Sequence, residues 1–289
     1  MGNKYLTILA GSPRGGEKTW ETLYREVLSP LSSDLAICTG SKWIANQSLL
    51  HEAKYKWIFE EPKDWFTYYE EKFNGKWKEF FNQGKNTGLY NSGSIHFAIK
   101  DIILSNYLDI IMEYDQVIYT RFDQYYVEKH PNFTGNNIYI PSGEDYLGLC
   151  DRHAVIPVDY IANYLNICKY INQQSSITKE KTFINCEVAY KNHLLTTNLY
   201  GKVKRYDRKQ FTSALKEDRT NWRVPKYKLY FSGGLLLKYP DELISSFEKE
   251  SMLIKIKYIF SRKNIIFTNY LYLKLRRYVG RLKGKKLNE

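Results

Sequence analysis

The fold class is decided by the stretch Tyr5-Leu6-Thr7-Ile8-Leu9-Ala10 and by Gly11-Ser12-Pro13-Arg14-Gly15-Gly16-Glu17-Lys18-Thr19-Trp20, which follows it directly. The first six residues are almost all apolar and predict a buried strand, and the glycines after them predict a tight turn. We predict a helix next, from about Lys18 to Val27. A buried strand, a turn and a helix in this order are typical of the start of an α/β layered fold.

Strand and helix signals continue to alternate through the first 170 residues, which favours a Rossmann-like α/β fold with a mostly parallel sheet flanked by helices. The predicted strands are Leu35–Cys38, Lys56–Phe59 and Gln116–Thr120. The predicted helices are Asp64–Phe81 (with Asp64 as N-cap), Ile95–Met112, Val158–Ile171 and Cys186–Thr196.

The charge of the chain is concentrated at its C-terminal end. The whole chain of 289 residues carries a formal net charge of +12. From Lys249 to Glu289 there are 12 Lys or Arg residues against two Glu, so this part contributes 12 − 2 = +10 and residues 1–248 contribute about +2. We therefore predict a globular domain over residues 1–240 and a basic amphipathic helical tail over residues 241–289. The nearly neutral body argues against a nucleic-acid-binding protein, because such proteins carry a basic footprint.

The composition of the chain argues against several other classes of protein. Hydrophobic residues make up 43% and charged residues 26% of the chain, which is a globular balance. The apolar runs are shorter than the roughly 18 residues that a membrane-spanning helix needs. No secretion signal is recognisable, and the four cysteines are too widely scattered for a disulfide framework or a zinc cluster. We expect a cytoplasmic protein.

The glycine-rich turn after the first strand is the first candidate site. Such a turn offers free backbone N–H groups and a helix N-terminus, both of which suit a phosphate. It nearly matches the phosphate-binding pattern G-x-x-x-x-G-K-[ST], but Glu17 intrudes between Gly16 and Lys18. The alternative is a tight structural turn whose glycines adopt special backbone angles.

The second candidate site lies at the end of the predicted strand Gln116–Thr120, where Arg121 and Asp123 follow. Ligands of open α/β sheets bind at the carboxyl ends of the strands. If the strand continues, the two side chains point to the same side, where a carboxylate could hold a divalent cation and a guanidinium could pair with a phosphate. The alternative is a structural Arg–Asp pair.

The third candidate site is a carboxylate-bearing loop within the segment 138–156, IYIPSGEDYLGLCDRHAVI. Glu144 and Asp145 are also common turn residues, but Asp151-Arg152 adjoins an apolar segment and is expected to be held firmly. Glu187 begins a predicted helix, where an acidic residue is commonly explained by the helix dipole alone.

In this order, the motifs GSPRGGEKTW, TRFD and IYIPSGEDYLGLCDRHAV resemble those of small nucleotide-sugar glycosyltransferases with a GT-A-like fold. Such enzymes occur in bacterial surface-polysaccharide clusters and in chloroviruses that glycosylate their capsids. The resemblance covers roughly residues 5–200. It implies transfer of a sugar from a nucleoside diphosphate, with UDP as the expected nucleotide, to a glycan acceptor.

The resemblance also implies roles for individual residues. GT-A enzymes hold Mn²⁺ or Mg²⁺ and the diphosphate with a D-x-D motif, but here Arg121 replaces the first Asp, which leaves Asp123 as the candidate metal ligand. An inverting transfer needs a carboxylate base, for which Asp151 is the first candidate and Glu187 the second. The expected nucleotide-sugar-binding residues are Gly11, Ser12, Pro13, Arg14, Arg121, Asp123 and Arg152.

Two other functions remain open for the body. A sulfotransferase uses a P-R-S-G-T-T-W type of loop, which resembles residues 13–20, but its second signature needs a Ser where this chain has Lys129. A nucleic-acid-binding protein would be consistent with the basic charge and the 16% aromatic content.

The tail suggests a membrane partner. Residues Met252–Val279 interleave apolar and aromatic residues with Lys and Arg, a pattern that suits the surface of an anionic membrane. We expect peripheral association with the cytoplasmic membrane face. The alternative is that the tail helices pack on the body.

Overall fold

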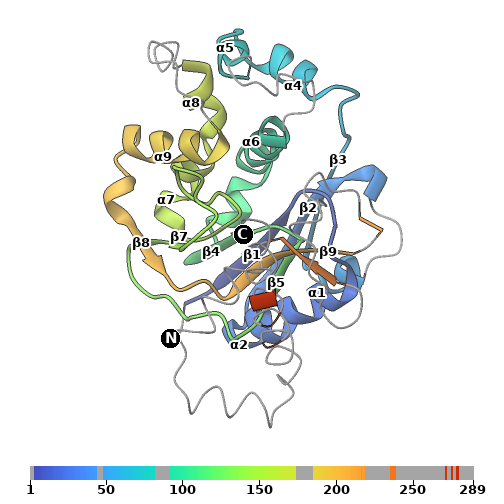
Figure 1. Ribbon diagram of the computed structural model, residues 1–289. Helices are drawn as coiled ribbons and strands as arrows, with labels where there is room; N and C mark the ends of the chain where they lie inside the picture. Colours follow the sequence, from blue (N-terminus) through green and yellow to red (C-terminus); the bar gives the residue numbers. More distant parts are fainter. Residues whose placement is uncertain are drawn as a thin grey trace, which may run out of the picture. The chain divides into compact units, whose positions relative to one another are not determined.

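The computed structural model describes residues 3–43, 48–81, 92–173, 185–215, 217–218 and 235–238, together with Leu271, Leu275, Tyr278 and Val279. Residue 240 and nearly all of the predicted basic tail therefore lie outside the described residues, and the domain boundary near that residue stays a prediction. Figure 1 labels the helices and strands.

The chain divides into two compact units, each built from several segments. Unit 1 consists of Met1–Pro13, Val27–Phe122 and Pro131–Tyr206, and unit 2 consists of Arg14–Glu26, Asp123–His130 and Asp207–Glu289.

Unit 1 contains a seven-stranded sheet with the order β3-β2-β1-β4-β7-β6-β8. Strands β3, β2, β1 and β4 are mutually parallel, β7 is antiparallel to both β4 and β6, and β8 is parallel to β6. The prediction of an α/β fold with a mostly parallel sheet is thus confirmed. The strands are β1 (Tyr5–Ala10), β2 (Asp34–Gly40), β3 (Tyr55–Phe59), β4 (Gln116–Thr120), β6 (Ile138–Pro141), β7 (His153–Pro157) and β8 (Val203–Tyr206).

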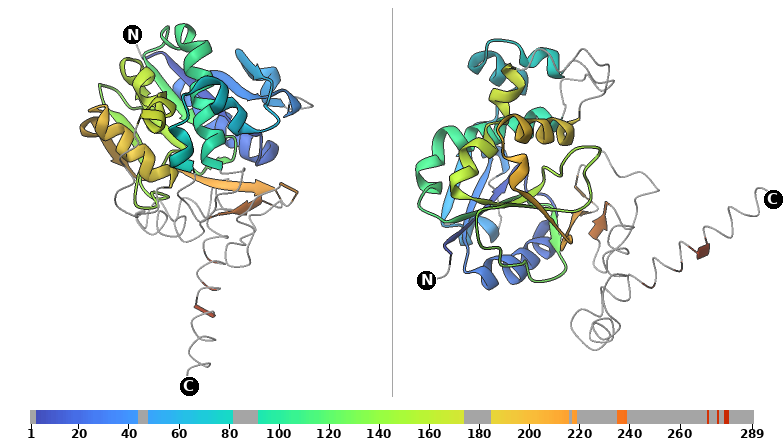
Figure 2. Two further views of the ribbon diagram at one scale, coloured as in Figure 1. Left: turned by 90° about the horizontal axis from the view of Figure 1, so that it is seen from above. Right: turned by 90° about the vertical axis from the view of Figure 1, so that its left-hand side faces the viewer.

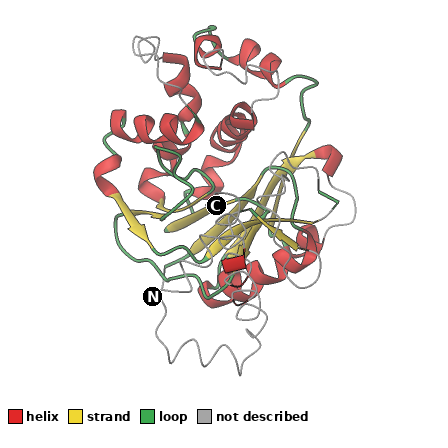
Figure 3. Ribbon diagram, in the orientation of Figure 1, coloured by secondary structure: helices red, strands yellow, loops and turns green. Residues whose placement is uncertain are grey.

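The central strands are apolar along their whole length because both faces of the sheet are covered. Every residue of β1, β4 and β7 is buried, as expected for strands in the middle of such a sheet. Figure 3 shows helices α6 to α9 grouped beside these strands, and Figure 2 shows the same helices from two further sides.

The helices of unit 1 vary widely in length, and the longest is α6. They are α2 (Ser29–Leu31), η2 (Ser41–Trp43), α3 (Ser48–Glu52), α4 (Trp65–Lys72), α5 (Trp77–Phe81), α6 (Ser92–Ile111), α7 (Val158–Leu165), α8 (Ile167–Gln173), α9 (Cys186–Thr196) and η3 (Tyr200–Lys202).

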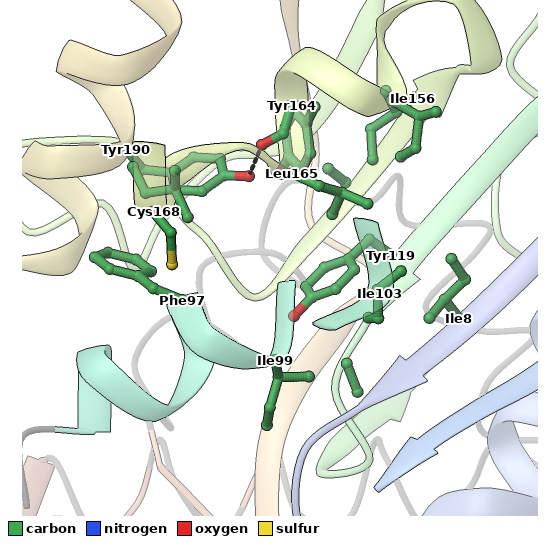
Figure 4. Packing of buried hydrophobic residues seen from close by; sticks show 14 of the residues in the cluster. Ile8, Phe97, Ile99, Ile103, Tyr119, Ile156, Tyr164, Leu165, Cys168 and Tyr190 are labelled. Carbon is green, nitrogen blue, oxygen red and sulfur yellow. Dashed lines mark hydrogen bonds between the residues drawn. The ribbon is translucent and has the colours of Figure 1, made fainter. Parts of the chain in front are cut away.

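The main hydrophobic core of unit 1 lies between α6 to α9 and the centre of the sheet. Phe97 and Ile103 of α6, Tyr119 of β4 and Ile156 of β7 are all buried in it (Figure 4). The Tyr190 hydroxyl donates a hydrogen bond of 2.6 Å to the main-chain oxygen of Tyr164, which ties α9 to α7. This packing fixes the elements that carry the candidate site.

Unit 2 pairs a small sheet with the first helix. The sheet has the order β10-β9-β5, with β5 (Gln124–Tyr126), β9 (Gln210–Leu215) and β10 (Leu235–Leu237). Helix α1 (Gly16–Leu23) continues into the π-helical turn η1 (Tyr24–Leu28), whose last two residues belong to unit 1. The buried hydroxyls of Thr19 and Ser213 lie 2.9 Å apart and connect α1 to β9.

Several predicted boundaries are confirmed, and the differences have local causes. Strand Gln116–Thr120 and helix Cys186–Thr196 have the predicted bounds, and Asp64 caps α4 by accepting a hydrogen bond from the Phe66 N–H at 3.0 Å. The helix predicted over Asp64–Phe81 is instead two helices, because Phe73 has an extended backbone that ends α4, and Gly75, with a φ of 96°, lies in the turn before α5. Strands β9 and β10 were not predicted.

Candidate functional site

The register of the sheet in unit 1 brings three predicted segments to one edge. Leu9 of β1 is opposite Thr120 of β4, and Thr120 is opposite His153 of β7. Because β7 runs antiparallel, its start lies at the edge where β1 and β4 end. Gly11, Arg121 and the residues just before His153 therefore meet at the carboxyl edge of the parallel strands.

This edge includes the point where the strand order reverses. Strands β3-β2-β1-β4 have the order of the first half of a Rossmann sheet. In this order, β2 and β3 are added on one side of β1, and the chain then crosses to form β4 on the other side of β1. Ligands of open α/β sheets bind in the crevice outside the carboxyl ends at such a switch point. The position of Gly11 and Arg121 is thus the one where an α/β protein is expected to bind a ligand.

The turn at Gly11 requires glycine. Its φ of 112° lies in a region that other residues rarely adopt, and its N–H donates a 3.0 Å hydrogen bond to the carbonyl of Cys38 at the end of β2. A β-carbon built on Gly11 would lie 3.8 Å from Cε1 of His96, so α6 contributes a histidine beside this turn. Ser12 and Pro13 follow and are half-buried.

The rest of the glycine-rich turn belongs to unit 2 and is engaged by protein groups. The Gly15 N–H donates to Oδ2 of Asp218 at 2.9 Å, and the same oxygen accepts from the Leu215 N–H at 2.7 Å. A β-carbon on Gly16 would lie 2.5 Å from Cδ1 of Leu215. The N-terminus of α1 is thus occupied by a carboxylate of the chain itself.

Arg121 and Asp123 are not neighbours on one strand. Strand β4 ends at Thr120, so the alternation of side chains along a strand does not extend to them, and they fall into different units. The Asp123 carboxylate is 2% exposed and lies 3.1 Å from the Arg14 guanidinium. The carboxylate of Asp123 thus forms an ion pair with Arg14 within unit 2.

A divalent cation does not fit Asp123 in this arrangement, because the buried carboxylate is already neutralised by Arg14. Among the described residues, no group of three or more His, Cys, Asp or Glu residues is placed to hold a metal ion.

Asp151 lies in unit 1, directly before β7, and its side chain is 8% exposed. In the described part of the chain, no hydrogen bond reaches its carboxylate, and the closest ion-pair partner is Nη1 of Arg152, 3.8 Å from Oδ1. Beneath it lies Lys100 of α6, which is 1% exposed and whose Nζ is 3.5 Å from the main-chain oxygen of Asp151. The carboxylate therefore has an open hydrogen-bonding capacity in a buried, positively charged setting.

The charges around Asp151 decide its protonation. Burial by itself would raise the pKa of the Asp151 carboxyl. The positive charges of Lys100 and Arg152 oppose this effect, and His96 and Arg121 act in the same direction. The pKa consequently lies below its usual value, and Asp151 is ionised at neutral pH.

The buried Lys100 side chain has no carboxylate partner at ion-pair distance among the described residues. Its Nζ lies 4.7 Å from the ring centre of Tyr119 and 4.8 Å from that of Tyr190, an arrangement that stabilises a desolvated ammonium. Burial nevertheless lowers the pKa of Lys100, against the raising effect of Asp151. Lys100 was not predicted as a site residue. The sequence did contain a signal, because Lys100 lies three residues from both Phe97 and Ile103 and therefore falls within the apolar stripe of the helix.

Arg152 is the centre of a second buried group of charges. Its Nη2 donates to Oε1 of Glu187 at 2.9 Å, and its Nη1 donates to the main-chain oxygen of Glu144 at 3.3 Å. The Glu144 carboxylate lies 3.6 Å from Nε. One guanidinium is thus shared by the carboxylates of Glu144, Asp151 and Glu187, which the structure brings together from the loop between β6 and β7 and from helix α9.

The pKa of the Glu187 carboxyl group lies near neutrality. Burial is the largest cause, the charge of Asp151 adds to it, and Arg152 only partly opposes them, so the pKa of Glu187 is raised to about 7. A group with such a pKa can exchange protons at physiological pH. The helix-dipole explanation of this acidic residue is therefore incomplete.

This raised pKa predicts a pH-dependent difference in stability between the wild type and Glu187→Gln. The folded state binds the proton more tightly than the unfolded chain, so the free energy of unfolding of the wild type falls as the pH rises from about 4.5 to about 7. The fall amounts to about 3 kcal/mol if the shift is fully expressed. Urea unfolding from pH 5 to pH 8 should show the variant gaining stability relative to the wild type. A difference that does not change with pH would contradict this prediction, and Glu113→Gln is the exposed control.

Comparisons with known proteins give no assignment for this chain. No protein-family model matches it, and no curated protein matches it significantly in sequence. In the described residues, no helix has both the length and the apolar character needed to cross a membrane.

Proposed function

We propose that this protein is a GT-A-like glycosyltransferase that moves a sugar from a nucleoside-diphosphate sugar, UDP-sugar first, to a glycan acceptor. The observation that carries the proposal is the meeting of Gly11, Arg121 and Asp151-Arg152 at the switch point of a Rossmann-like sheet. This edge combines a glycine turn, several cations and an ionised carboxylate. Sugar transfer from a nucleotide needs each of these.

The cations suit the leaving diphosphate. Arg121 follows β4 directly, and the Arg152 guanidinium lies at the start of β7 on the same edge. Positive groups that are fixed before the reaction stabilise the charge that develops on a leaving group, because they need no reorganisation. Ser12 and Pro13 belong to the same turn, and we assign this turn and Arg121 to the nucleotide sugar.

Asp151 is the better candidate for the base in an inverting transfer. Its carboxylate is ionised, and no hydrogen bond from the described residues engages it. Glu187 is the second candidate, but its Oε1 already accepts a hydrogen bond from Arg152 at 2.9 Å. A base must accept the proton of the attacking hydroxyl, which favours Asp151. Arg152 then orients the carboxylates and can contact the donor.

The sulfotransferase alternative is less well supported. Its phosphate loop would correspond to residues 13–20, where a phosphate would bind at the N-terminus of α1. There Asp218 accepts the hydrogen bond from the Gly15 N–H, and Thr19 is hydrogen-bonded to Ser213. A phosphate would have to displace a carboxylate of the chain.

We also propose a cytoplasmic location with peripheral attachment to an anionic membrane through the basic tail. Leu271, Leu275, Tyr278 and Val279 are helical and exposed. Their spacing of four, three and one residues places them on one side of a helix, which suits a membrane surface. Nucleic acid is not part of the proposal.

The proposal predicts which ligands stabilise the protein. In a thermal-shift panel of UDP-, GDP- and dTDP-sugars and the sulfotransferase sulfate donor, we expect one nucleotide sugar to raise the Tm, because a ligand that binds only the folded state stabilises it. At 100 times the Kd the stabilisation is about 2.7 kcal/mol. Arg121→Gln should abolish the shift.

The control is Lys204→Gln, at an exposed position on β8, which should keep the full shift. A shift with the sulfate donor alone would support the alternative function. No shift with any nucleotide sugar would refute the proposal.

A further inference from the structure

The loop between β6 and β7 has an unusual backbone. Four of its residues have positive φ angles, namely Gly143 (92°), Glu144 (51°), Tyr146 (42°) and Leu147 (73°). Residues other than glycine, asparagine and aspartate rarely adopt such angles, and each instance costs of order 1–2 kcal/mol. This loop is therefore strained at three non-glycine positions.

Contacts with three other parts of unit 1 hold the strained loop in place. Arg205 of β8 lies 2.9 Å from both carboxylate oxygens of Asp145. The Asn185 side-chain amide donates to the main-chain oxygen of Tyr146 at 2.8 Å. Gly148 packs so closely on α9 that a β-carbon would lie 2.0 Å from the main-chain oxygen of Glu187. Strain that is fixed by its surroundings in this way is a feature of functional sites.

The strained loop leaves two large apolar side chains exposed to different degrees. Leu147 is 91% exposed and Tyr146 is 41% exposed. The Tyr146 ring lies 5.5 Å from the guanidinium carbon of Arg152. Glycine or asparagine at position 147 would satisfy the backbone at lower cost and lose no packing. The leucine therefore needs an explanation outside the folded chain.

We propose that Tyr146 and Leu147 form a binding surface, the acceptor lip, for the C–H face of a sugar ring in a neutral glycan acceptor. The lip adjoins Arg152 and, through Gly148, Glu187, so a bound acceptor lies next to the carboxylate cluster. Exposed apolar groups rimmed by polar residues mark interaction sites. The identification of the glycan as an acceptor rests on the proposed function.

The charge of the loop favours a neutral glycan over an anionic membrane. From Ser142 to Arg152 there are three carboxylates, Glu144, Asp145 and Asp151, against one guanidinium. Asp145 is paired with Arg205, and the other two carboxylates are buried beside Arg152, so the charges of the loop are compensated and do not form a basic surface that attracts anionic lipid headgroups. A sugar ring has no net charge, and its apolar face can pack on an aromatic ring and a leucine.

The first test measures stability. Leu147→Gly and Leu147→Asn relieve the strained backbone without removing buried surface, so we expect the Tm to rise by roughly 2–4 °C. Met112→Ala, which trims another half-exposed apolar side chain, is the control and should leave the Tm nearly unchanged. An unchanged or lower Tm in both Leu147 variants would contradict the strain on which the inference depends.

The second test measures glycan binding with the full chain on an array of neutral oligosaccharides. We expect the wild type to bind at least one of them and Leu147→Gly, Leu147→Asn and Tyr146→Ala to bind at least tenfold more weakly. Tyr200→Ala, at another partly exposed tyrosine, and Met112→Ala should bind normally. Equal binding by the wild type and the Leu147 variants, or no binding by the wild type, would overturn the proposal.

Two further measurements separate this inference from its alternatives. The nucleotide-sugar thermal shift should be the same in the lip variants as in the wild type. Loss of nucleotide-sugar binding and loss of oligosaccharide binding are therefore measured independently. Binding to phosphatidylcholine vesicles that disappears in Leu147→Gly would assign the lip to lipid and overturn the glycan proposal. Vesicle binding that the variant retains is a property of another part of the chain and leaves the glycan proposal standing.

Discussion

Replacing Asp151 with Asn is expected to lower sugar transfer by a factor of about 10² to 10⁴, the usual contribution of a general base. Asn is nearly isosteric with Asp but cannot accept the acceptor proton. The turnover number kcat should fall, whereas the nucleotide-sugar thermal shift should persist, because the donor is assigned to Arg121 and the turn at Gly11. Initial rates of transfer with the purified chain measure this effect.

Two controls make the result interpretable. Asp159→Asn changes an exposed carboxylate in the first turn of α7 and should leave transfer intact. Asp151→Asn should also remain folded, because one charged member of the cluster is replaced by a neutral group of the same shape. Wild-type turnover in Asp151→Asn would show that this carboxylate is structural, and a matching loss in Glu187→Gln alone would transfer the role to Glu187.

Replacing Arg152 with Met should have the largest effect on stability. The guanidinium is the shared partner of the carboxylates of Glu144, Asp151 and Glu187, all of which are buried. Removing one partner of a buried ion pair leaves uncompensated charge and costs about 3–5 kcal/mol. We expect this loss in the free energy of unfolding from urea denaturation at pH 7.5.

The matched control is Arg205→Met, which breaks the Arg205–Asp145 pair. The side chains of that pair are each about one-third exposed, so its loss should cost no more than about 1 kcal/mol. Adding Glu187→Gln to Arg152→Met should restore part of the lost stability, because one unpaired charge is removed. Equal losses in Arg152→Met and Arg205→Met would mean that the buried cluster is not held together by the guanidinium.

The sequence was sufficient to predict the layered α/β fold and most of its elements. Buried parallel strands such as Tyr5–Ala10 and Gln116–Thr120 are short runs of apolar, partly β-branched residues, and this composition is visible without any partner. Helix capping is also local, which is why the role of Asp64 could be predicted. The strands of unit 2 were missed because their pairing joins residues far apart in the chain, such as Gln124 and Thr212.

For the candidate site, the sequence by itself determined which residue types follow the strands, but not which of them meet. Arg121 and Asp123 were expected to face one site if the strand continued, but β4 ends at Thr120 and the Asp123 carboxylate pairs with Arg14. The ionised state of Asp151 depends on Lys100 and Arg152, and the raised pKa of Glu187 depends on burial and on the charge of Asp151. Only packing brings these groups together. Local propensity fixes elements over a few residues, whereas burial and charge-charge interactions depend on distances that are set when helix α6, the loop before β7 and helix α9 pack together.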